Sequence, residues 1–269
     1  MLDKDRPTDE EILKFERMIK DEQTAHLPLV SDLLDFTSIE EEYGSGSLPI
    51  YQSKIAYLKK TCLNMRTVRK DGNCFYRAFA FRFCELIRQN YGMPWYDAVI
   101  SKCAATKDLM LTMGYDMEIL ADFYEPFEEA VMKCEESELL GRFLTVHTSD
   151  TIVCYLRLVT AALLKRDRDI YEAFILDSYP SMDGFISHCV EPSIKILKLV
   201  CVESDQIHIV AMANVFGVDI KVANLDTTSS EGINYHEISA MEPIQIDNSP
   251  TISLLYRPGH YDVLYPKPL

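Results

Sequence analysis

A cysteine and a histidine from distant parts of the chain have the neighbours that a thiol-dependent hydrolase needs. Cys74 follows the turn residues Asp71, Gly72 and Asn73, and it precedes aromatic residues that recur every four positions. This spacing predicts a helix that begins at or next to the cysteine. Unpaired backbone N–H groups and the positive end of the helix dipole favour a thiolate there. Gly72 would let the loop N–H groups converge on one point, the geometry that holds a tetrahedral oxyanion.

His260 is the histidine that is best placed to act as the base. It follows Pro258-Gly259 in a turn, and Asp262 comes two residues later. If a strand begins after the turn, His260 and Asp262 point to the same face, so the carboxylate can hold the imidazole in the tautomer that accepts the cysteine proton. The pattern therefore predicts a Cys, His, Asp arrangement for nucleophilic catalysis.

Each of these residues also has a purely structural interpretation. A cysteine after a turn is more often a structural residue, and a histidine in a Pro-Gly turn is more often only exposed. The other five histidines have weaker settings. His208 lies on an apolar helix face and is expected in the core, while His188 points away from its neighbour Cys189. The remaining three have no carboxylate in a supporting position: His26, His147 and His236.

The elements that would carry these residues are mostly helical in the middle of the chain and extended near its end. Ser204 is the expected N-cap of the last helix, and Gly217 is its expected C-terminal glycine. The predicted helices cover Phe75–Gln89, Ser149–Leu164, Asp169–Leu176 and Asp205–Phe216. The predicted strands cover Val218–Val222, Thr251–Tyr256 and Tyr261–Tyr265, the last two forming a hairpin. This order indicates an α+β fold, with a helical body first and a small, mostly antiparallel sheet late in the sequence.

The first 45 residues form an acidic N-terminal arm with thirteen acidic and five basic residues. Thr8-Asp-Glu-Glu11 is a capping box, and the apolar residues after it have helical spacing, which predicts one amphipathic helix from Thr8 to about Gln23. The helix either packs on the domain or folds against a partner. The flexible stretch Tyr43–Pro49 separates this arm, residues 1–45, from the predicted catalytic domain, residues 46–269.

Composition and charge exclude several classes of protein. The chain has 269 residues, 48% of them hydrophobic, which is enough for a full-sized core. Its net charge of −15 disfavours nucleic acid and anionic membranes as partners and favours a basic protein or peptide. Residues 54–82 are basic and should further favour the thiolate, whereas residues 116–138 are acidic and typical of a solvated helical face.

No signal peptide or apolar run of membrane-spanning length is present, so we expect a soluble, intracellular protein. The eight cysteines contain no CxxC pair, and reduced, mostly buried thiols are expected. A structural zinc site is not expected, because such a site usually takes two ligands from one tight turn. The sequence calls for no metal and no cofactor.

Two longer motifs make a resemblance specific. Asp71-Gly-Asn-Cys74-Phe-Tyr-Arg-Ala-Phe79 and Tyr256-Arg-Pro-Gly-His260-Tyr-Asp262 resemble the otubain branch of the ovarian-tumour (OTU) family of cysteine deubiquitinases. The similarity continues through Val153–Leu158 and Glu203–Ile209 and covers roughly residues 30 to 265. The resemblance implies a papain-like OTU fold, and it assigns a role to each site residue.

The resemblance assigns Cys74 as nucleophile, His260 as general base and Asp262 as the residue that orients the histidine. Asp71 corresponds to the aspartate that is usually counted with the catalytic residues, and it shapes the oxyanion loop with Gly72, Asn73 and Cys74. The residues that would contact ubiquitin are Val210, Asp226, Tyr256 and Tyr261. Asn224 and Ala80 depart from residues found in some relatives.

The function that the resemblance implies is hydrolysis of isopeptide bonds in polyubiquitin, with a preference for lysine-forty-eight linkages. It also implies inhibition of ubiquitin-conjugating enzymes through the arm, without catalysis, and a cytoplasmic location with the nucleus as a second compartment. The partners are ubiquitin, polyubiquitin chains and conjugating enzymes. Two alternatives stay open: a mainly non-catalytic protein that sequesters a charged conjugating enzyme, and a general cysteine peptidase.

Overall fold

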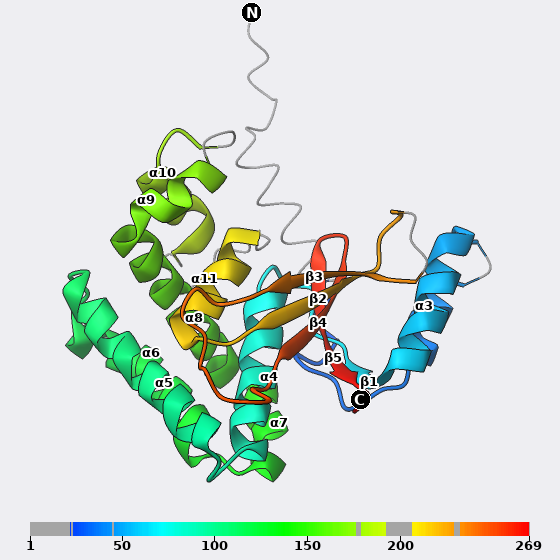
Figure 1. The fold of residues 1–269 in the computed structure, drawn as a ribbon, viewed down its shortest axis with the longest axis horizontal. Helices are drawn as coiled ribbons and strands as arrows, with labels where there is room; N and C mark the ends of the chain where they lie inside the picture. Colours follow the sequence, from blue (N-terminus) through cyan, green and yellow to red (C-terminus); the bar gives the residue numbers. More distant parts are fainter. Residues whose placement is uncertain are drawn as a thin grey trace, which may run out of the picture.

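A five-stranded sheet occupies the middle of the molecule, with helix α3 on one side and a larger helical body on the other (Figure 1). This computed structural model describes residues 22, 24–44, 46–175, 179–191, 206–228 and 232–268. The predicted amphipathic helix at Thr8 and the predicted N-cap Ser204 lie outside these residues. The α+β class predicted from the sequence is confirmed.

Most of the helices lie between the first strand and the second in the sequence. The helices are α2 (Thr37–Glu42), α3 (Pro49–Thr61), α4 (Cys74–Gln89), α5 (Pro94–Thr112), α6 (Met117–Glu128), α7 (Glu136–Leu144), α8 (Val146–Arg166), α9 (Arg168–Tyr171), α10 (Met182–Phe185) and α11 (Gln206–Phe216). Short π or 3₁₀ turns are η1 (Glu129–Lys133), η2 (Glu172–Phe174) and η3 (Ile186–Val190). The strands are β1 (Cys62–Arg66), β2 (Ile220–Asn224), β3 (Asn234–Ile238), β4 (Ile252–Arg257) and β5 (His260–Pro266).

The strands are ordered β1-β5-β4-β2-β3, and only β2 and β4 pair in parallel. The sheet is therefore mostly antiparallel, as predicted. Strands β1 and β3 were not predicted: β1 follows α3 directly, and β3 has three polar residues among its five. The strand expected at 218–222 begins two residues later, since Gly217 has a φ of +65° and Val218 still bonds back to the helix.

The two faces of the sheet are covered by different helices. Side chains that alternate along β4 and β5 explain this, because successive residues of a strand point to opposite faces. Leu254 and Val263 pack in the core with α4, α8 and α11. Leu255 and Leu264 pack in a second cluster with α2 and α3. The adjacent strands β4 and β5 are thus buried on both faces, which fixes their register.

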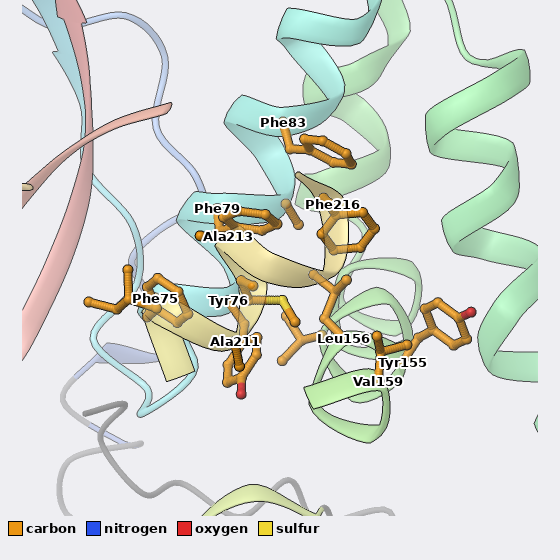
Figure 2. Packing of buried hydrophobic residues seen from close by; sticks show 14 of the residues in the cluster. Phe75, Tyr76, Phe79, Phe83, Tyr155, Leu156, Val159, Ala211, Ala213 and Phe216 are labelled. Carbon is orange, nitrogen blue, oxygen red and sulfur yellow. The ribbon is translucent and has the colours of Figure 1, made fainter. Parts of the chain in front are cut away.

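Helix α4 links the sheet to the helical body through a column of aromatic rings. Figure 2 shows Phe79 and Phe83 of α4 against Phe216 of α11, with α8 alongside. The ring centroids of Phe79 and Phe83 are 5.5 Å apart, and those of Phe83 and Phe216 are 4.7 Å apart. These contacts pack the middle of α4 against α11. The observed helix confirms the one predicted from Phe75.

Helix α8 is buried continuously from Thr151 to Leu164 and is longer at both ends than the sequence predicted. The helix expected at Asp169–Leu176 is wrong in form: α9 ends at Tyr171, and the 3₁₀ turn η2 follows. No helix in the described ranges has the length and apolar character that a bilayer span requires.

Part of the predicted arm is packed against the sheet. Val30 pairs with Val68, and Leu34 pairs with Met65 of β1. Phe36 and Ile39 are buried in the cluster between α3 and the sheet. The domain boundary at residue 45 stays a prediction, but residues 29 to 43 make these contacts with the domain that follows them.

Candidate active site

Cys74 is the first residue of α4, and its thiol is buried at the start of the helix. The residue before it, Asn73, is the N-cap, and Gly72 has a φ of +80°, a conformation that favours glycine. The N–H groups of the first turn have no partner within the helix. The sulfur therefore lies at the positive end of the helix dipole, as the sequence predicted, in a setting that stabilises a thiolate.

His260 and Asp262 form the second half of the site. His260 opens β5 directly after the two-residue turn Pro258-Gly259, and Gly259 has a φ of +72°. Its Nε2 lies 2.8 Å from Oδ1 of Asp262, which confirms that the two side chains share a face. Among the described residues, Nδ1 makes no hydrogen bond to oxygen or nitrogen. This nitrogen is the one that remains for the thiol of Cys74.

Burial and charge act in opposite directions on the imidazole. Burial lowers the pKa of His260, but the Asp262 carboxylate and hydrogen bonds to Asp262 and Cys74 raise it, and the net result is a pKa of about 9. Burial also opposes ionisation of Asp262, yet His260, Arg257 and the Val68 N–H hold its pKa below the usual value. The pair is therefore an imidazolium and a carboxylate at neutral pH.

Asp71 shapes the loop before the nucleophile and is tied to α4. Its Oδ1 accepts a hydrogen bond from the N–H of Asn73 at 2.9 Å, and its Oδ2 lies 2.6 Å from Nη2 of Arg77. Arg77 is fully buried and also donates to Ser149 and Asp150 at the start of α8. The aspartate thus fixes the loop rather than the imidazole.

A second buried guanidinium holds the same loop from α8. Arg157 donates to the Gly72 carbonyl at 3.0 Å, to Oδ1 of Asn73 at 3.1 Å and to the Cys189 carbonyl at 3.2 Å. Its guanidinium also lies over the Tyr76 ring, 4.7 Å from the centroid. With Gly72 and Asn73 held in this way, the N–H groups of the loop and of Cys74 keep a fixed direction.

Sequence reasoning did not identify Arg77 or Arg157 as parts of the site. Arg77 was counted in a basic stretch, and Arg157 lies in a helix that reads as core. The signal that could have identified them is a charged residue inside a run of apolar residues. Such a residue is expected to be buried, and a buried charge requires hydrogen-bonding or charged partners.

Comparison with known proteins assigns the family. The family profile described as peptidase C65, otubain, matches residues 22–266. The chain belongs to the otubain family. Its described cysteine, histidine and loop aspartate therefore occupy an otubain peptidase fold, and the resemblance seen in the two motifs is confirmed.

Curated relatives and solved structures agree with this assignment. Ubiquitin thioesterase OTUB1 of Homo sapiens is 34% identical over 262 residues, covering 96% of this otubain and 90% of that protein. OVARIAN TUMOR DOMAIN-containing deubiquitinating enzyme 1 of Arabidopsis thaliana is 35% identical over 272 residues, covering 93% and 84%. The structure of h/ceOTUB1-ubiquitin aldehyde-UBC13~Ub aligns with a TM-score of 0.80 at 25% identity, covering 97% of this chain and 99% of that one.

A cavity of about 250 Å³ opens beside Cys74 of this otubain. Tyr256 and Tyr261, both predicted to contact ubiquitin, line it, and their ring centroids are 5.1 Å apart. The sequence did not predict the other residues around it, which come from α11, β2, β3 and the β4–β5 turn: Gln206, Ile209, Val222, Asn224, His236, Ile238 and Gly259. The cavity can receive an extended chain end next to the thiol.

The other two predicted contacts, Val210 and Asp226, do not line this cavity. Val210 is half-buried on α11 and packs against the main core. Asp226 follows β2 and lies 2.6 Å from the buried ammonium of Lys54. Contact between these two residues and ubiquitin stays a prediction.

Part of the basic stretch at residues 54–82 is neutralised by nearby carboxylates. Lys54 pairs with Asp226, Arg77 pairs with Asp71, and Arg82 pairs with Glu85. The start of α4 and His260 are the positive groups beside the sulfur, and a further effect of the basic stretch on the thiol stays a prediction.

The other described cysteines differ from Cys74 in their surroundings. Burial raises the pKa of Cys154 to about 12, and it also raises the pKa values of Cys62, Cys84, Cys103 and Cys134. Protonated, buried thiols of this kind are poor nucleophiles. Across the described ranges, no three His, Cys, Asp or Glu side chains are grouped closely enough to hold a metal ion.

Proposed function

We propose that this otubain is a thiol-dependent deubiquitinase that hydrolyses the isopeptide bond between ubiquitin and a lysine. The observation that carries the proposal is the buried His260–Asp262 pair, 2.8 Å apart, beside a cysteine at the start of a helix. The family and the names of its relatives support the ubiquitin substrate. The cavity beside Cys74 fits the extended carboxyl end of such a substrate.

The mechanism follows from the positions of the charges. The Cys74 thiolate, paired with the His260 imidazolium, attacks the carbonyl carbon of the terminal glycine of ubiquitin. The N–H groups of the loop and of Cys74 hold the oxyanion, and His260 gives its proton to the departing lysine amine. A water molecule, deprotonated by His260, then attacks the acyl-enzyme and releases ubiquitin and the thiolate. Asp262 keeps the imidazole in one tautomer throughout.

A ubiquitin probe with an electrophilic carboxyl terminus tests this function. We expect one covalent adduct per chain, on Cys74, and cleavage of diubiquitin by the same preparation. Unrelated peptides should stay intact, because the cavity alone contributes little binding energy compared with a folded ubiquitin. No adduct on Cys74, or equally fast cleavage of unrelated peptides, would contradict the proposal and favour a general cysteine peptidase.

We also propose that this otubain prefers lysine-forty-eight-linked chains and binds ubiquitin-conjugating enzymes. Supporting this, solved structures similar to the chain include h/ceOTUB1 with ubiquitin aldehyde and UBC13~Ub, and with ubiquitin aldehyde and UBCH5B~Ub. The acidic arm predicted from the sequence is the segment that we assign to this second partner. A mainly non-catalytic protein remains the alternative function. The cytoplasmic and nuclear locations stay predictions.

Deleting residues 1–21 tests the arm. This deletion keeps Leu29 and Val30, which are buried against the domain, so the catalytic unit should remain folded. We expect the variant to react with the ubiquitin probe as the full chain does. Its inhibition of chain synthesis by a conjugating enzyme should weaken roughly tenfold or more, because a second binding contact is lost.

The same pair of proteins, tested on diubiquitins of every linkage, measures the linkage preference with and without residues 1–21. Unchanged inhibition after the deletion would contradict the assignment of the arm. Equal rates on all linkages with the full chain would contradict the lysine-forty-eight preference.

A further inference from the structure

The carboxylate of Asp262 has two oxygens with different partners. Oδ1 accepts from Nε2 of His260 and from the N–H of Val68, at 2.8 and 2.9 Å. Oδ2 lies 2.7 Å from Nη2 of Arg257, the last residue of β4. Asp262 is fully buried, and the Arg257 side chain is 8% exposed. The guanidinium is therefore held against the far side of the catalytic carboxylate.

Arg257 has a second ion-pair partner from a distant segment. Its Nη1 donates to Oε2 of Glu42, the last residue of α2. Tyr43, which caps the same helix, is the other titratable group from this segment that interacts with Arg257. A continuous chain of ion pairs thus runs from α2 through Arg257 and Asp262 to His260, whose other described titratable neighbour is Cys74.

We propose that Arg257 and Glu42 are positioning residues of this catalytic site: Arg257 fixes the second oxygen of Asp262, and Glu42 fixes Arg257. The proposal rests on the thiol hydrolase function proposed above. The ion pair between Arg257 and Oδ2 opposes rotation of Asp262 away from the imidazole. Arg257 also offsets part of the negative charge that His260 experiences, and Glu42 in turn offsets part of the charge of Arg257.

The order of the charges gives the two residues opposite electrostatic effects. Without the cation of Arg257, Asp262 stabilises the imidazolium more strongly, and the pKa of His260 rises. Without the anion of Glu42, Arg257 acts more strongly on Asp262 and His260, and that pKa falls. A purely structural contact would slow the reaction in both variants without shifting the titration in opposite directions.

The test measures kcat/KM for diubiquitin between pH 6 and pH 10, where the alkaline limb reports loss of the His260 proton. For Arg257→Gln, we expect the limb to move up by roughly 0.5–1 pH unit and kcat to fall about tenfold with little change in KM. For Glu42→Gln, we expect a downward shift of roughly 0.2–0.5 pH unit, since this half-exposed charge is partly screened. Arg257→Lys keeps the cation, so its alkaline limb should lie at the same pH as that of the unaltered protein.

Glu41→Gln is the matched control. Glu41 is exposed on the same helix, and its replacement removes the same charge. We expect its alkaline limb to coincide with that of the unaltered protein. Glu42 is 55% exposed, so Glu42→Gln should fold even if Arg257→Gln does not. A Glu42→Gln profile that is unshifted, or shifted upward, overturns the proposal. Lack of activity in the unaltered protein would instead contradict the proposed function itself.

Discussion

Replacing Cys74 with alanine is expected to abolish hydrolysis of diubiquitin, with turnover falling on the order of 10⁴-fold or more. The reason is that, among the described cysteines, only Cys74 is the first residue of a helix, so nothing replaces the nucleophile. Cys74 is nearly buried and loses only its sulfur, so the free energy of unfolding should change by about 1 kcal/mol. Steady-state turnover and thermal unfolding of the same preparation measure both quantities.

Cys154→Ala is the control for this substitution. Cys154 is also a buried cysteine in a helix, but its thiol is protonated because burial raises its pKa to about 12. We expect this variant to turn over diubiquitin within about twofold of the unaltered protein. Measurable cleavage by Cys74→Ala would show that the reaction does not use this thiol, and the non-catalytic or a different hydrolytic function would then be favoured.

Replacing Arg157 with methionine is expected to lower the free energy of unfolding by about 3–5 kcal/mol, because three buried acceptors lose their donor. The substitution leaves the carbonyls of Gly72 and Cys189 and the Asn73 side chain without these hydrogen-bond donors in a buried place. The oxyanion loop then loses one of its two guanidinium supports. We expect kcat to fall about 10²-fold in the folded fraction, with KM changing less.

Arg166→Met is the matched control for the Arg157 variant. Arg166 lies on the same helix, but it is half-exposed and its ion pair is with the adjacent residue Asp167. Its replacement should cost no more than about 1 kcal/mol. Denaturant unfolding followed by single-turnover kinetics separates the two effects. An Arg157→Met protein as stable and as active as the control would refute the assigned support of the loop.

The positions of Cys74, His260 and Asp262 were predictable because each is signalled locally. A turn sequence before a helix placed Cys74 at a helix start, and the spacing of two residues put His260 and Asp262 on one strand face. The supports of these residues were not predictable in the same way. Arg157 reaches Asn73 across 84 positions, and Arg257 reaches Glu42 across 215, so no short pattern connects them.

In the fold, too, the elements that depend on local sequence were predictable, whereas those that depend on distant contacts were not. Helix α4 follows from aromatic residues that recur every four positions, and the β4–β5 hairpin follows from Pro258-Gly259 between two apolar runs. Strand β1 and the shifted start of β2 depend on which strands they pair with, which is a tertiary property. Lys54 was counted only as part of the basic stretch for the same reason, because its partner Asp226 lies 172 positions away.

The order of Cys74 and β5 along the chain has a consequence for protein synthesis. The thiol of Cys74 is made well before His260, which arrives only with β5, and β5 then pairs with both β4 and the much earlier β1. A nascent chain, or a product of premature termination before residue 260, therefore contains the cysteine without the histidine that completes the proposed site. We thus expect no hydrolytic activity until β5 has been synthesised and the long-range strand pairing has formed.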